Sequence, residues 1–458
     1  MSSSVDTIAA IATGGGISAI GILRVSGPEA VSAVDAVFRP GDGKSMSLHR
    51  DRELVYGALL DETGRTLDLC LCTVSRAPHS YTGEDTAELQ CHGSPVVLSA
   101  GLKSLFARGV RQALAGEFTR RAFLNGRLDL TRAEAVIDII EARTALAARN
   151  AAGQLSGAVQ RSADGIYDAL TDICSHYHAV LDYPDEDIEP FTLASYEKTL
   201  RDAEEKLRRL LGTFERGQYL DRGVPAVIAG KPNAGKSSLL IALLGYDRAI
   251  VTDIPGTTRD TLSEGCVVGG VPLRLTDTAG MRAAADTVEA MGVERARAAA
   301  EEARLLIAVF DLSRPWERED EDVLALAKAA PCAIAAANKC DLPPLWDPER
   351  LTGEFDRVCV LSAREGTGLS DLEKAVGECF PLPEAEAGEI LTNARQAEAI
   401  GRGADYLAAA VAAMEEGWPP DAVLTQCEGA MEALAELTGR IVRQDVTDKI
   451  FSRFCVGK

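Results

Sequence analysis

Alternating apolar and polar positions dominate the first quarter of the chain. The runs "GILRVSG", "ELVYGALL", "LDLCLCTVS" and "TAELQCHG" have the two-residue period of half-buried strands, and Gly and Pro separate them. One longer run, "PVVLSAGLKSLFARG", has helical spacing instead. Residues 1–125 are therefore predicted to form an α+β domain.

The pattern changes twice further along the chain. Residues 126–221 carry apolar residues at helical spacing in Ala-, Leu- and Arg-rich runs, with one break at "DYPDEDIEPF". Residues 222–381 alternate apolar strands with helical stretches, as an α/β domain does, and residues 382–458 are helical again. The simplest architecture has the α/β domain inserted into one discontinuous helical domain.

Composition agrees with a soluble globular protein, since 46% of the 458 residues are hydrophobic and 26% are charged. The net charge of -21 disfavours non-specific binding of nucleic acid. An RNA substrate would need a local basic surface or a partner. An arginine-rich stretch is one candidate for that surface, although an ordinary solvated helix face explains it equally well. Its members are Arg108, Arg111, Arg120, Arg121, Arg127, Arg132, Arg143 and Arg149.

Targeting and metal signals are weak. The N-terminus lacks the basic and apolar regions of a signal peptide, and no uninterrupted apolar run of about 18 residues is present. The eleven cysteines form no CxxC pair, which favours reduced thiols and a cytoplasmic location. His176 and His178 lie near Asp172 and Asp182, but their spacing does not match a common zinc site.

The strongest motif is a phosphate-binding loop between a predicted strand and a predicted helix. Gly230–Ser237 reads GKPNAGKS, which matches GxxxxGKS. Backbone N–H groups of such a loop wrap a phosphate. Lys236 is expected to reach the β- and γ-phosphates, and Ser237 is expected to bind Mg²⁺.

Three later motifs select guanine nucleotides. "LRLTDTAG" puts Asp277 at a strand end, near the expected Mg²⁺, and Gly280 can donate its N–H to the γ-phosphate. Asn338–Asp341 reads NKCD, and the carboxylate of Asp341 can accept from guanine N1–H and from the exocyclic amine. "VCVLSAREG" supplies Ser362-Ala363, which matches the loop behind the base. The order of the four motifs is that of a GTPase.

The predicted GTP contacts cover all of these motifs. They are Asn233, Ala234, Gly235, Lys236, Ser237, Ser238, Thr252, Asp253, Ile254, Pro255, Gly256, Thr257, Thr258, Asp277, Thr278, Ala279, Gly280, Asn338, Lys339, Asp341, Ser362, Ala363 and Arg364.

The catalytic group is less evident from the motifs. Ras-type proteins carry a water-orienting Gln directly after DTAG, and this chain has Met281 there. Asp286 and Glu289 follow in "AAADTVEAMGVERA", and either could orient water or be an ordinary surface carboxylate. The segment "VTDIPGTTRD" lies where the first switch is expected, and it offers Thr257 or Thr258 to Mg²⁺. It contains no evident arginine finger; Arg259 is a candidate, but a switch arginine more often has a structural role.

Taken together, GKPNAGKS, DIPGTTRD, DTAG followed by a hydrophobic residue and a terminal FCVGK resemble the MnmE (TrmE) family of tRNA-modification GTPases. The resemblance spans essentially the whole chain and includes "GGGISAIGILRVSG", "SYTGEDTAELQCHG" and "GEFTRRAFLNGRLDLTRAEAV". It implies a dimerising, tetrahydrofolate-binding N-terminal domain (1–125), a helical domain in two parts (126–221 and 382–458) and an inserted Ras-like G domain (222–381).

The resemblance also implies ligands. Arg24, Glu88, Arg127 and Lys458 fall at folate-contacting positions, and relatives often have Lys where this chain has Arg127. Mg²⁺ would be bound by Ser237 and Thr258. Potassium would be bound by Asn233, Thr252, Ile254 and Thr257, and this cation would replace the missing arginine finger. Glu289 matches the catalytic Glu of the family.

The activity implied by the resemblance is potassium-dependent GTP hydrolysis coupled to tRNA modification. With the FAD-containing partner MnmG (GidA), the family modifies C5 of the wobble uridine, position 34, of certain tRNAs to a (carboxymethyl)aminomethyl group. The one-carbon unit comes from a 5-formyl- or methylene-tetrahydrofolate. A homodimer, a larger complex with the partner and no membrane association are implied.

The closing FCVGK raises a separate question about Cys455. The last four residues resemble a prenylation box only in the position of the Cys, because Gly457 and Lys458 follow and no polybasic run precedes them. A buried structural Cys is one remaining interpretation. A working thiol of the modification chemistry, activated by Lys458, is the interpretation that we favour.

Two alternatives come from other classes of protein. A ribosome-assembly GTPase of the Era or Der type shares the G-domain motifs, but the first carries a KH domain after the G domain and the second carries two P-loops. This chain has one P-loop and a helical C-terminus. The other alternative is a switch GTPase without modification chemistry, which a folate-binding assay would distinguish.

Overall fold

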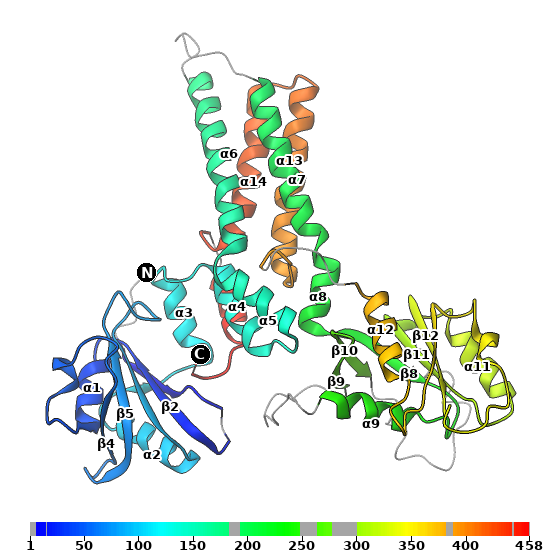
Figure 1. Cartoon of the computed structure of the whole chain (residues 1–458). Helices are drawn as coiled ribbons and strands as arrows, with labels where there is room; N and C mark the ends of the chain where they lie inside the picture. Colours follow the sequence, from blue (N-terminus) through cyan, green and yellow to red (C-terminus); the bar gives the residue numbers. More distant parts are fainter. Residues whose placement is uncertain are drawn as a thin grey trace.

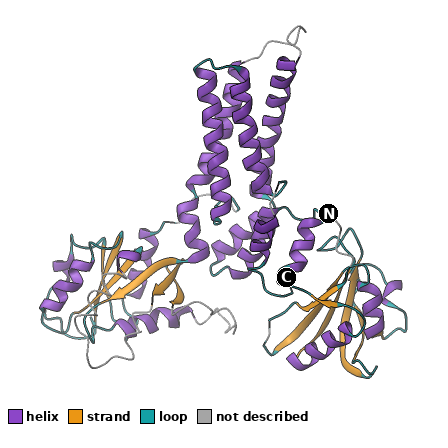
Figure 2. Cartoon of the chain, turned by 180° about the vertical axis from the view of Figure 1, so that it is seen from behind, coloured by secondary structure: helices purple, strands orange, loops and turns teal. Residues whose placement is uncertain are grey.

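The computed structural model describes residues 6–14, 16–182, 193–247, 263–276, 300–381, 388–441 and 444–457. These residues form an N-terminal sheet domain, a stack of long helices and a second sheet domain (Figure 1). The two sheet domains lie on either side of the base of the helical stack in both views (Figure 2). None of the described helices is long and apolar enough to cross a membrane.

The N-terminal domain is built on a seven-stranded sheet in the order β3-β4-β5-β6-β2-β1-β7. Its strands are β1 (Ile8–Ile11), β2 (Ser18–Ser26), β3 (Phe38–Pro40), β4 (Val55–Leu60), β5 (Thr66–Ser75), β6 (Thr86–Gly93) and β7 (Arg111–Gln112). Buried and accessible residues alternate along β6, as the sequence pattern predicts. The buried side chains pack against α1 (Ala30–Val37) and α2 (Pro95–Phe106). The α+β prediction for this region is confirmed.

Two distant segments of the chain build the helical domain. The first contributes α4 (Leu130–Glu141), α5 (Ala145–Leu155), α6 (Ala158–Asp182), α7 (Leu193–Gly212) and α8 (Phe214–Arg222). The second contributes α13 (Ala394–Glu415), α14 (Pro420–Thr438) and α15 (Gln444–Phe451). Helix α3 (Glu117–Leu124), which precedes α4, lies in the N-terminal domain, where Phe118 packs with Ile8 and Ala10. Helices α6, α7, α13 and α14 stand side by side in Figure 1.

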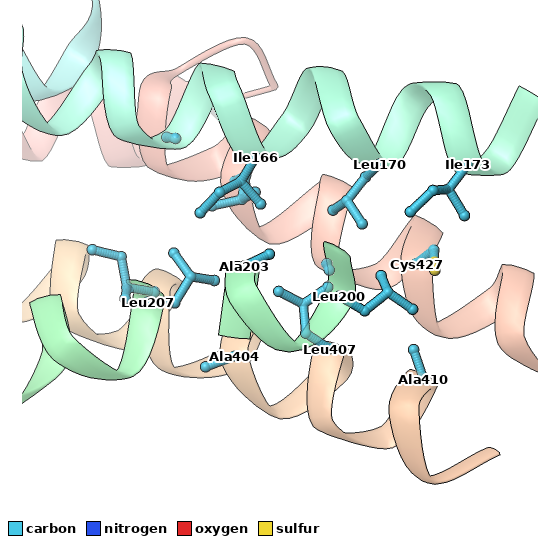
Figure 3. Close-up of a cluster of buried hydrophobic side chains, with 14 of the residues drawn as sticks. Ile166, Leu170, Ile173, Leu200, Ala203, Leu207, Ala404, Leu407, Ala410 and Cys427 are labelled. Atoms are coloured by element: carbon cyan, nitrogen blue, oxygen red, sulfur yellow. The ribbon is translucent and has the colours of Figure 1, made fainter. Parts of the chain in front are cut away.

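The core of this stack explains why the two segments fold together. Leu170 of α6, Leu200 of α7, Leu407 of α13 and Cys427 of α14 point into one buried cluster (Figure 3). Each fully buried Leu stabilises the fold by about 1.5–3 kcal/mol, so neither segment can bury its apolar face without the other. The predicted discontinuous helical domain is therefore confirmed.

A buried polar contact joins the same two segments near the base of the stack. Glu134 of α4 accepts hydrogen bonds from Nε and Nη2 of Arg395, each at 2.8 Å, and from Nε2 of Gln396 at 2.8 Å. The Glu134 side chain is only 4% exposed. A buried carboxylate requires partners of this kind, so the pairing specifies how α13 sits on α4.

The inserted domain has a six-stranded sheet in the order β13-β12-β11-β8-β10-β9. Its strands are β8 (Val224–Ala229), β9 (Ser263–Val268), β10 (Val271–Thr276), β11 (Leu305–Asp311), β12 (Cys332–Asn338) and β13 (Arg357–Val360). All neighbours are parallel except β9, which is antiparallel to β10. The described helices are α9 (Lys236–Asp247), α11 (Arg318–Leu326) and α12 (Leu369–Cys379). The carboxyl ends of the parallel strands share one edge, where such sheets bind ligands.

The end of the chain returns to the beginning. Val456 forms an isolated antiparallel bridge with Ala115, and the N–H of Gly116 donates to the carbonyl of Cys455 at 3.4 Å. Phe451 and Phe454 are buried beside Phe123 of α3. Figure 1 shows the C-terminus at the foot of α3, beside the N-terminal domain. The closing motif is thus part of the N-terminal surface.

Candidate functional site

The phosphate-binding loop has the strand-turn-helix setting that the sequence predicts. Strand β8 ends at Ala229 and α9 begins at Lys236, so the intervening turn lies at the ligand-binding edge of the sheet. Asn233 and Gly235 have φ values of 65° and 106°. A Cβ at Gly235 would lie 2.1 Å from Nδ2 of Asn338, so only glycine fits there.

Lys236 is the cation expected to hold the phosphates. Its Nζ donates to the carbonyls of Gly230 at 2.7 Å and Lys231 at 2.9 Å. Burial lowers the pKa of Lys236, because a charged ammonium is costly away from water. A phosphate oxygen beside this cation would offset that cost. The loop, the half-buried cation and the exposed Ser237 at the start of α9 therefore fit the phosphates of a nucleotide.

Asn338 connects three of the predicted motifs. Its Nδ2 donates to the carbonyl of Ala234 at 2.8 Å, and its Oδ1 accepts from the N–H of Ala363 at 3.0 Å. Ser362 is buried next to Ala363. The structure therefore brings the end of β12, the phosphate-binding loop and the loop after β13 together around one side chain.

The neighbouring residues of the NKCD motif have different environments. Nζ of Lys339 donates to Oδ2 of Asp311 at 2.6 Å and to the carbonyl of Asn233 at 2.8 Å. Asp341 is exposed at the edge of the sheet, where its carboxylate is accessible to a base. Arg364, also predicted to contact GTP, faces solvent and pairs with Glu365 at 3.4 Å.

Two contributors to this site were missed from the sequence. Nζ of Lys231 forms ion pairs with Oδ2 of Asp320 at 2.7 Å and with Oε2 of Glu317 at 3.1 Å, which tie the phosphate-binding loop to the start of α11. Asp311 is buried at the end of β11, and the ammonium of Lys339 and the hydroxyl of Ser313 help lower its pKa against the effect of burial. The acidic run "EREDED" could have predicted the start of α11, because acidic residues are favoured in the first turn of a helix. Nothing in the sequence predicts that these carboxylates pair with Lys231.

Several predicted residues lie outside the described part of the chain. They are Thr252, Asp253, Ile254, Pro255, Gly256, Thr257, Thr258, Asp277, Thr278, Ala279, Gly280, Asp286, Glu289 and Lys458. The roles predicted for the two switch segments and for Lys458 therefore stay predictions.

The predicted folate contacts lie in the N-terminal domain. Nε of Arg24 on β2 pairs with Oε1 of Glu88 on β6 at 2.9 Å, because these residues are opposite each other in the register of the two strands. The Arg24 guanidinium lies 5.6 Å from the ring centre of Tyr81, and its Nη1 lies 3.5 Å from the carbonyl oxygen of Gly457. Nε of Arg127 donates to the carbonyl of Ser80, next to Tyr81, at 3.2 Å.

This arrangement collects two cations, a carboxylate and the closing motif around one corner of the domain. Arg24 retains donors beyond the one that Glu88 uses. Cys455 is exposed on the same tail. These groups offer donors and an acceptor to a ligand that carries carboxylate and amide groups.

Three of the eight arginines in the arginine-rich stretch form ion pairs. Arg111 pairs with Asp6 at 2.7 Å and with Glu117 at 2.6 Å, and Arg120 pairs with Asp448 at 3.1 Å. Arg121 is buried and forms ion pairs with Asp6, Glu117 and Glu84. These three residues therefore serve mainly to hold the domain together.

The histidine pair forms no metal site in the described residues. Nδ1 of His176 lies 2.7 Å from the hydroxyl of Tyr196, and Nε2 of His178 lies 3.2 Å from Oε1 of Glu428. Across the described ranges, no cluster of three or more His, Cys, Asp and Glu side chains is arranged to hold a metal ion.

Comparison with known proteins covers the whole chain. The family profile "MnmE helical domain" matches residues 130–455, and "GTP-binding protein TrmE N-terminus" matches residues 7–127. The tRNA modification GTPase MnmE of Chloroflexus aurantiacus is 42% identical over 99% of this chain and 100% of its own length. Its namesakes from Alkaliphilus metalliredigens and Symbiobacterium thermophilum are 40% and 41% identical, each over 99% of both chains. With the motifs, the three-part architecture and these full-length similarities in agreement, the chain belongs to the MnmE family of tRNA modification GTPases.

Proposed function

We propose that this protein binds and hydrolyses GTP and uses the resulting conformational cycle to modify tRNA. The observation that carries the nucleotide part is the pair of bonds from Asn338 to Ala234 and Ala363. It places the guanine-reading motif directly against the phosphate-binding loop. A bound GTP would therefore satisfy both ends of one preformed site.

For hydrolysis, Lys236 would bind the terminal phosphates and neutralise charge as the bond to the γ-phosphate breaks. Ser237 and Thr258 would hold Mg²⁺, which supplies further charge neutralisation. Asn233, Thr252, Ile254 and Thr257 would hold potassium. Two observations support this potassium site: the first switch segment has no evident arginine finger, and Asn233 is exposed on the phosphate-binding loop.

Glu289 would orient the attacking water. This assignment rests on the family resemblance and on Met281, which cannot orient water at the position after DTAG. The G domain would then hydrolyse GTP without an arginine from a second protein.

The modification site would lie at the corner formed by Arg24, Glu88, Arg127 and the closing motif. We propose that it binds a 5-formyl- or methylene-tetrahydrofolate and that Cys455 takes part in the chemistry. Arg24 and Arg127 would hold carboxylate or carbonyl groups of the ligand, and Lys458 would add a third cation. The 3.5 Å approach of Arg24 to Gly457 supports a single site that includes the tail.

The reaction would be the addition of an aminomethyl-type group to C5 of the wobble uridine of certain tRNAs. We propose that a homodimer acts with the FAD-containing partner MnmG (GidA). The acidic chain, with a net charge of -21, supports a partner that carries much of the tRNA contact.

The test is nucleoside analysis of tRNA from cells that lack this protein. Modified wobble uridines should be absent, should return with the wild-type protein, and should not return with Lys236→Ala. Unchanged nucleosides in the deletion strain would contradict the tRNA function. In parallel, GTP turnover should fall strongly when NaCl replaces KCl at equal ionic strength, and equal rates would contradict the potassium role alone.

A further inference from the structure

Lys231, the second residue of the phosphate-binding loop, has different partners for its carbonyl and for its side chain. The carbonyl accepts a hydrogen bond from Nζ of Lys236 at 2.9 Å and another from the N–H of Ala234 at 3.2 Å. Nζ of Lys231 donates to Oδ2 of Asp320 at 2.7 Å and to Oε2 of Glu317 at 3.1 Å. Lys231 therefore connects the cation expected to hold the phosphates with the start of α11.

The ion pair between Lys231 and Asp320 is buried. Each of these two side chains is only 4% exposed. Separating them would leave a charge without its partner away from water, which is strongly unfavourable. Glu317, by contrast, is 57% exposed, so its carboxylate is the weaker of the two restraints. Asp320 is therefore the partner that fixes the position of the Lys231 side chain.

Asp320 is itself held in place by the helix that carries it. Its Oδ2 accepts the backbone N–H of Glu317 at 2.9 Å, as part of a capping box at the start of α11. Val323 and Leu326, further along α11, are buried in a hydrophobic cluster with strand residues of the sheet. Asp320 thus offers the phosphate-binding loop a fixed point on the core of the domain.

This restraint bears directly on Lys236. Nζ of Lys236 donates to two backbone carbonyls, those of Gly230 and Lys231. A lysine side chain is long and flexible, so the place of its ammonium depends on the groups that hold it. A shift of the Lys231 backbone would move one of these two acceptors. A site that is already ordered binds its ligand more tightly, because less ordering is required on binding.

We propose that Lys231 is a positioning residue for phosphate binding: its ion pair with Asp320 holds the loop so that the Lys231 carbonyl keeps the ammonium of Lys236 in place. This inference rests on the proposed binding of GTP at the same loop. The ammonium of Lys231 is used by the two carboxylates of α11. Lys231 therefore acts through Lys236 and not by its own contact with the phosphates.

The first test compares Lys231→Met with Lys231→Arg in the full-length protein. Methionine fills similar space without a charge, whereas arginine keeps a cation for both carboxylates. We expect the affinity for GTP and for GDP to fall about tenfold or more in Lys231→Met, since a hydrogen bond from a charged group is lost. Lys231→Arg should recover most of this loss. Isothermal titration with each nucleotide measures both effects.

The second test approaches the same ion pair from α11. Asp320→Asn keeps the size of the side chain and an acceptor for the N–H of Glu317, but it removes the negative charge beside Lys231. Its loss of GTP affinity should resemble that of Lys231→Met. The double variant should lose no more than Lys231→Met alone, because both changes break one interaction. Losses that add in the double variant would contradict a shared role.

The matched control is Lys328→Met, which removes an exposed lysine that lies 3.7 Å from Glu354 on the surface of the same domain. It should keep GTP affinity. Thermal unfolding of the nucleotide-free variants separates positioning from stability, since a purely structural role would lower the melting temperature and leave the affinity of the folded protein unchanged.

Wild-type affinity in folded Lys231→Met would overturn the inference and leave the proposed function intact. A loss that Lys231→Arg does not recover and Asp320→Asn does not reproduce would also overturn it. Failure of the wild-type protein to bind GTP would instead contradict the proposed function.

Discussion

Nδ2 of Asn338 donates a 2.8 Å hydrogen bond to the carbonyl of Ala234, across 104 residues of sequence. Both atoms are buried, and leaving either without its partner would cost about 1–3 kcal/mol. The guanine-reading motif and the phosphate-binding loop therefore form one structural unit. A change at this contact should affect recognition of the base and of the phosphates together.

The first prediction concerns Gly235→Ala. The added Cβ would lie 2.1 Å from Nδ2 of Asn338, and the φ of 106° is unfavourable for alanine. We expect GTP affinity to fall by at least about tenfold, since displacing the loop costs more than one buried hydrogen bond. Isothermal titration with GTP measures this.

The matched control is Gly245→Ala in the same helix-loop unit. A Cβ at Gly245 meets nothing within 4 Å, so this change should keep GTP affinity and raise stability by about 0.5–1 kcal/mol. Equal affinity in the two variants would show that the loop does not depend on the close approach of Asn338.

The second prediction concerns the pH dependence of stability at the base of the helical domain. Burial, followed by the charge of Asp221, raises the pKa of Asp138 to about 7. Glu134 acts in the same direction, while a 3.2 Å hydrogen bond from Thr392 and the charge of Arg453 oppose it. The folded state therefore keeps a proton that the unfolded state loses above a pH of about 4.

It follows that Asp138 destabilises the fold progressively as the pH rises from about 4 to 7, and that the effect is constant above this range. Asp138→Asn removes the cost, so its advantage over wild type should grow over the same range to a few kcal/mol. Denaturant unfolding at several pH values measures it. The exposed Asp202→Asn on α7 should show no such trend, and a flat difference for Asp138→Asn would refute the assignment.

The third prediction tests the folate corner with Arg24→Gln. The change removes a cation that lies against Glu88 and Tyr81 and leaves the strand intact. Since a hydrogen bond to a charged group contributes about 1.5–3 kcal/mol, affinity for 5-formyl-tetrahydrofolate should fall roughly tenfold or more. GTP turnover should persist. The control is Arg39→Gln, which changes an exposed residue on β3. Equal folate affinity in the two variants would show that the folate site does not include Arg24.

The fourth prediction concerns Glu289→Ala. If Glu289 orients water, single-turnover hydrolysis should slow by about 10²-fold or more while GTP affinity holds, because a transition-state contact affects only the chemical step. Asp286→Ala is the control and should hydrolyse GTP near the wild-type rate. The reverse result would transfer the role to Asp286.

The fifth prediction separates packing from chemistry in the closing motif. Cys455 is exposed, so Cys455→Ser should change stability by no more than about 0.5 kcal/mol, keep GTP hydrolysis and abolish wobble-uridine modification. Phe454→Ala, by contrast, removes a buried ring 5.7 Å from that of Phe451 and should cost about 3 kcal/mol or more. A Cys455→Ser protein that modifies tRNA at the wild-type rate would show that the thiol takes no part in the chemistry and that the closing motif has only a structural role.

Local patterns determined much of what the sequence could reveal. Residues of the phosphate-binding loop are neighbours along the chain, and a strand before it and a helix after it follow from periods of two and 3.6 residues. The β-rich start, the helical segments on either side of the insertion and the guanine-reading motif at the end of β12 were predictable for the same reason. Each depends on chemistry within a few residues.

Only the tertiary structure decided which distant groups meet. Arg24 reaches the carbonyl of Gly457 across 433 positions, and Lys231 pairs with Asp320 across 89. Such contacts follow from the joint packing of many elements, because a side chain's partner is set by where whole strands and helices lie and not by its neighbours in sequence.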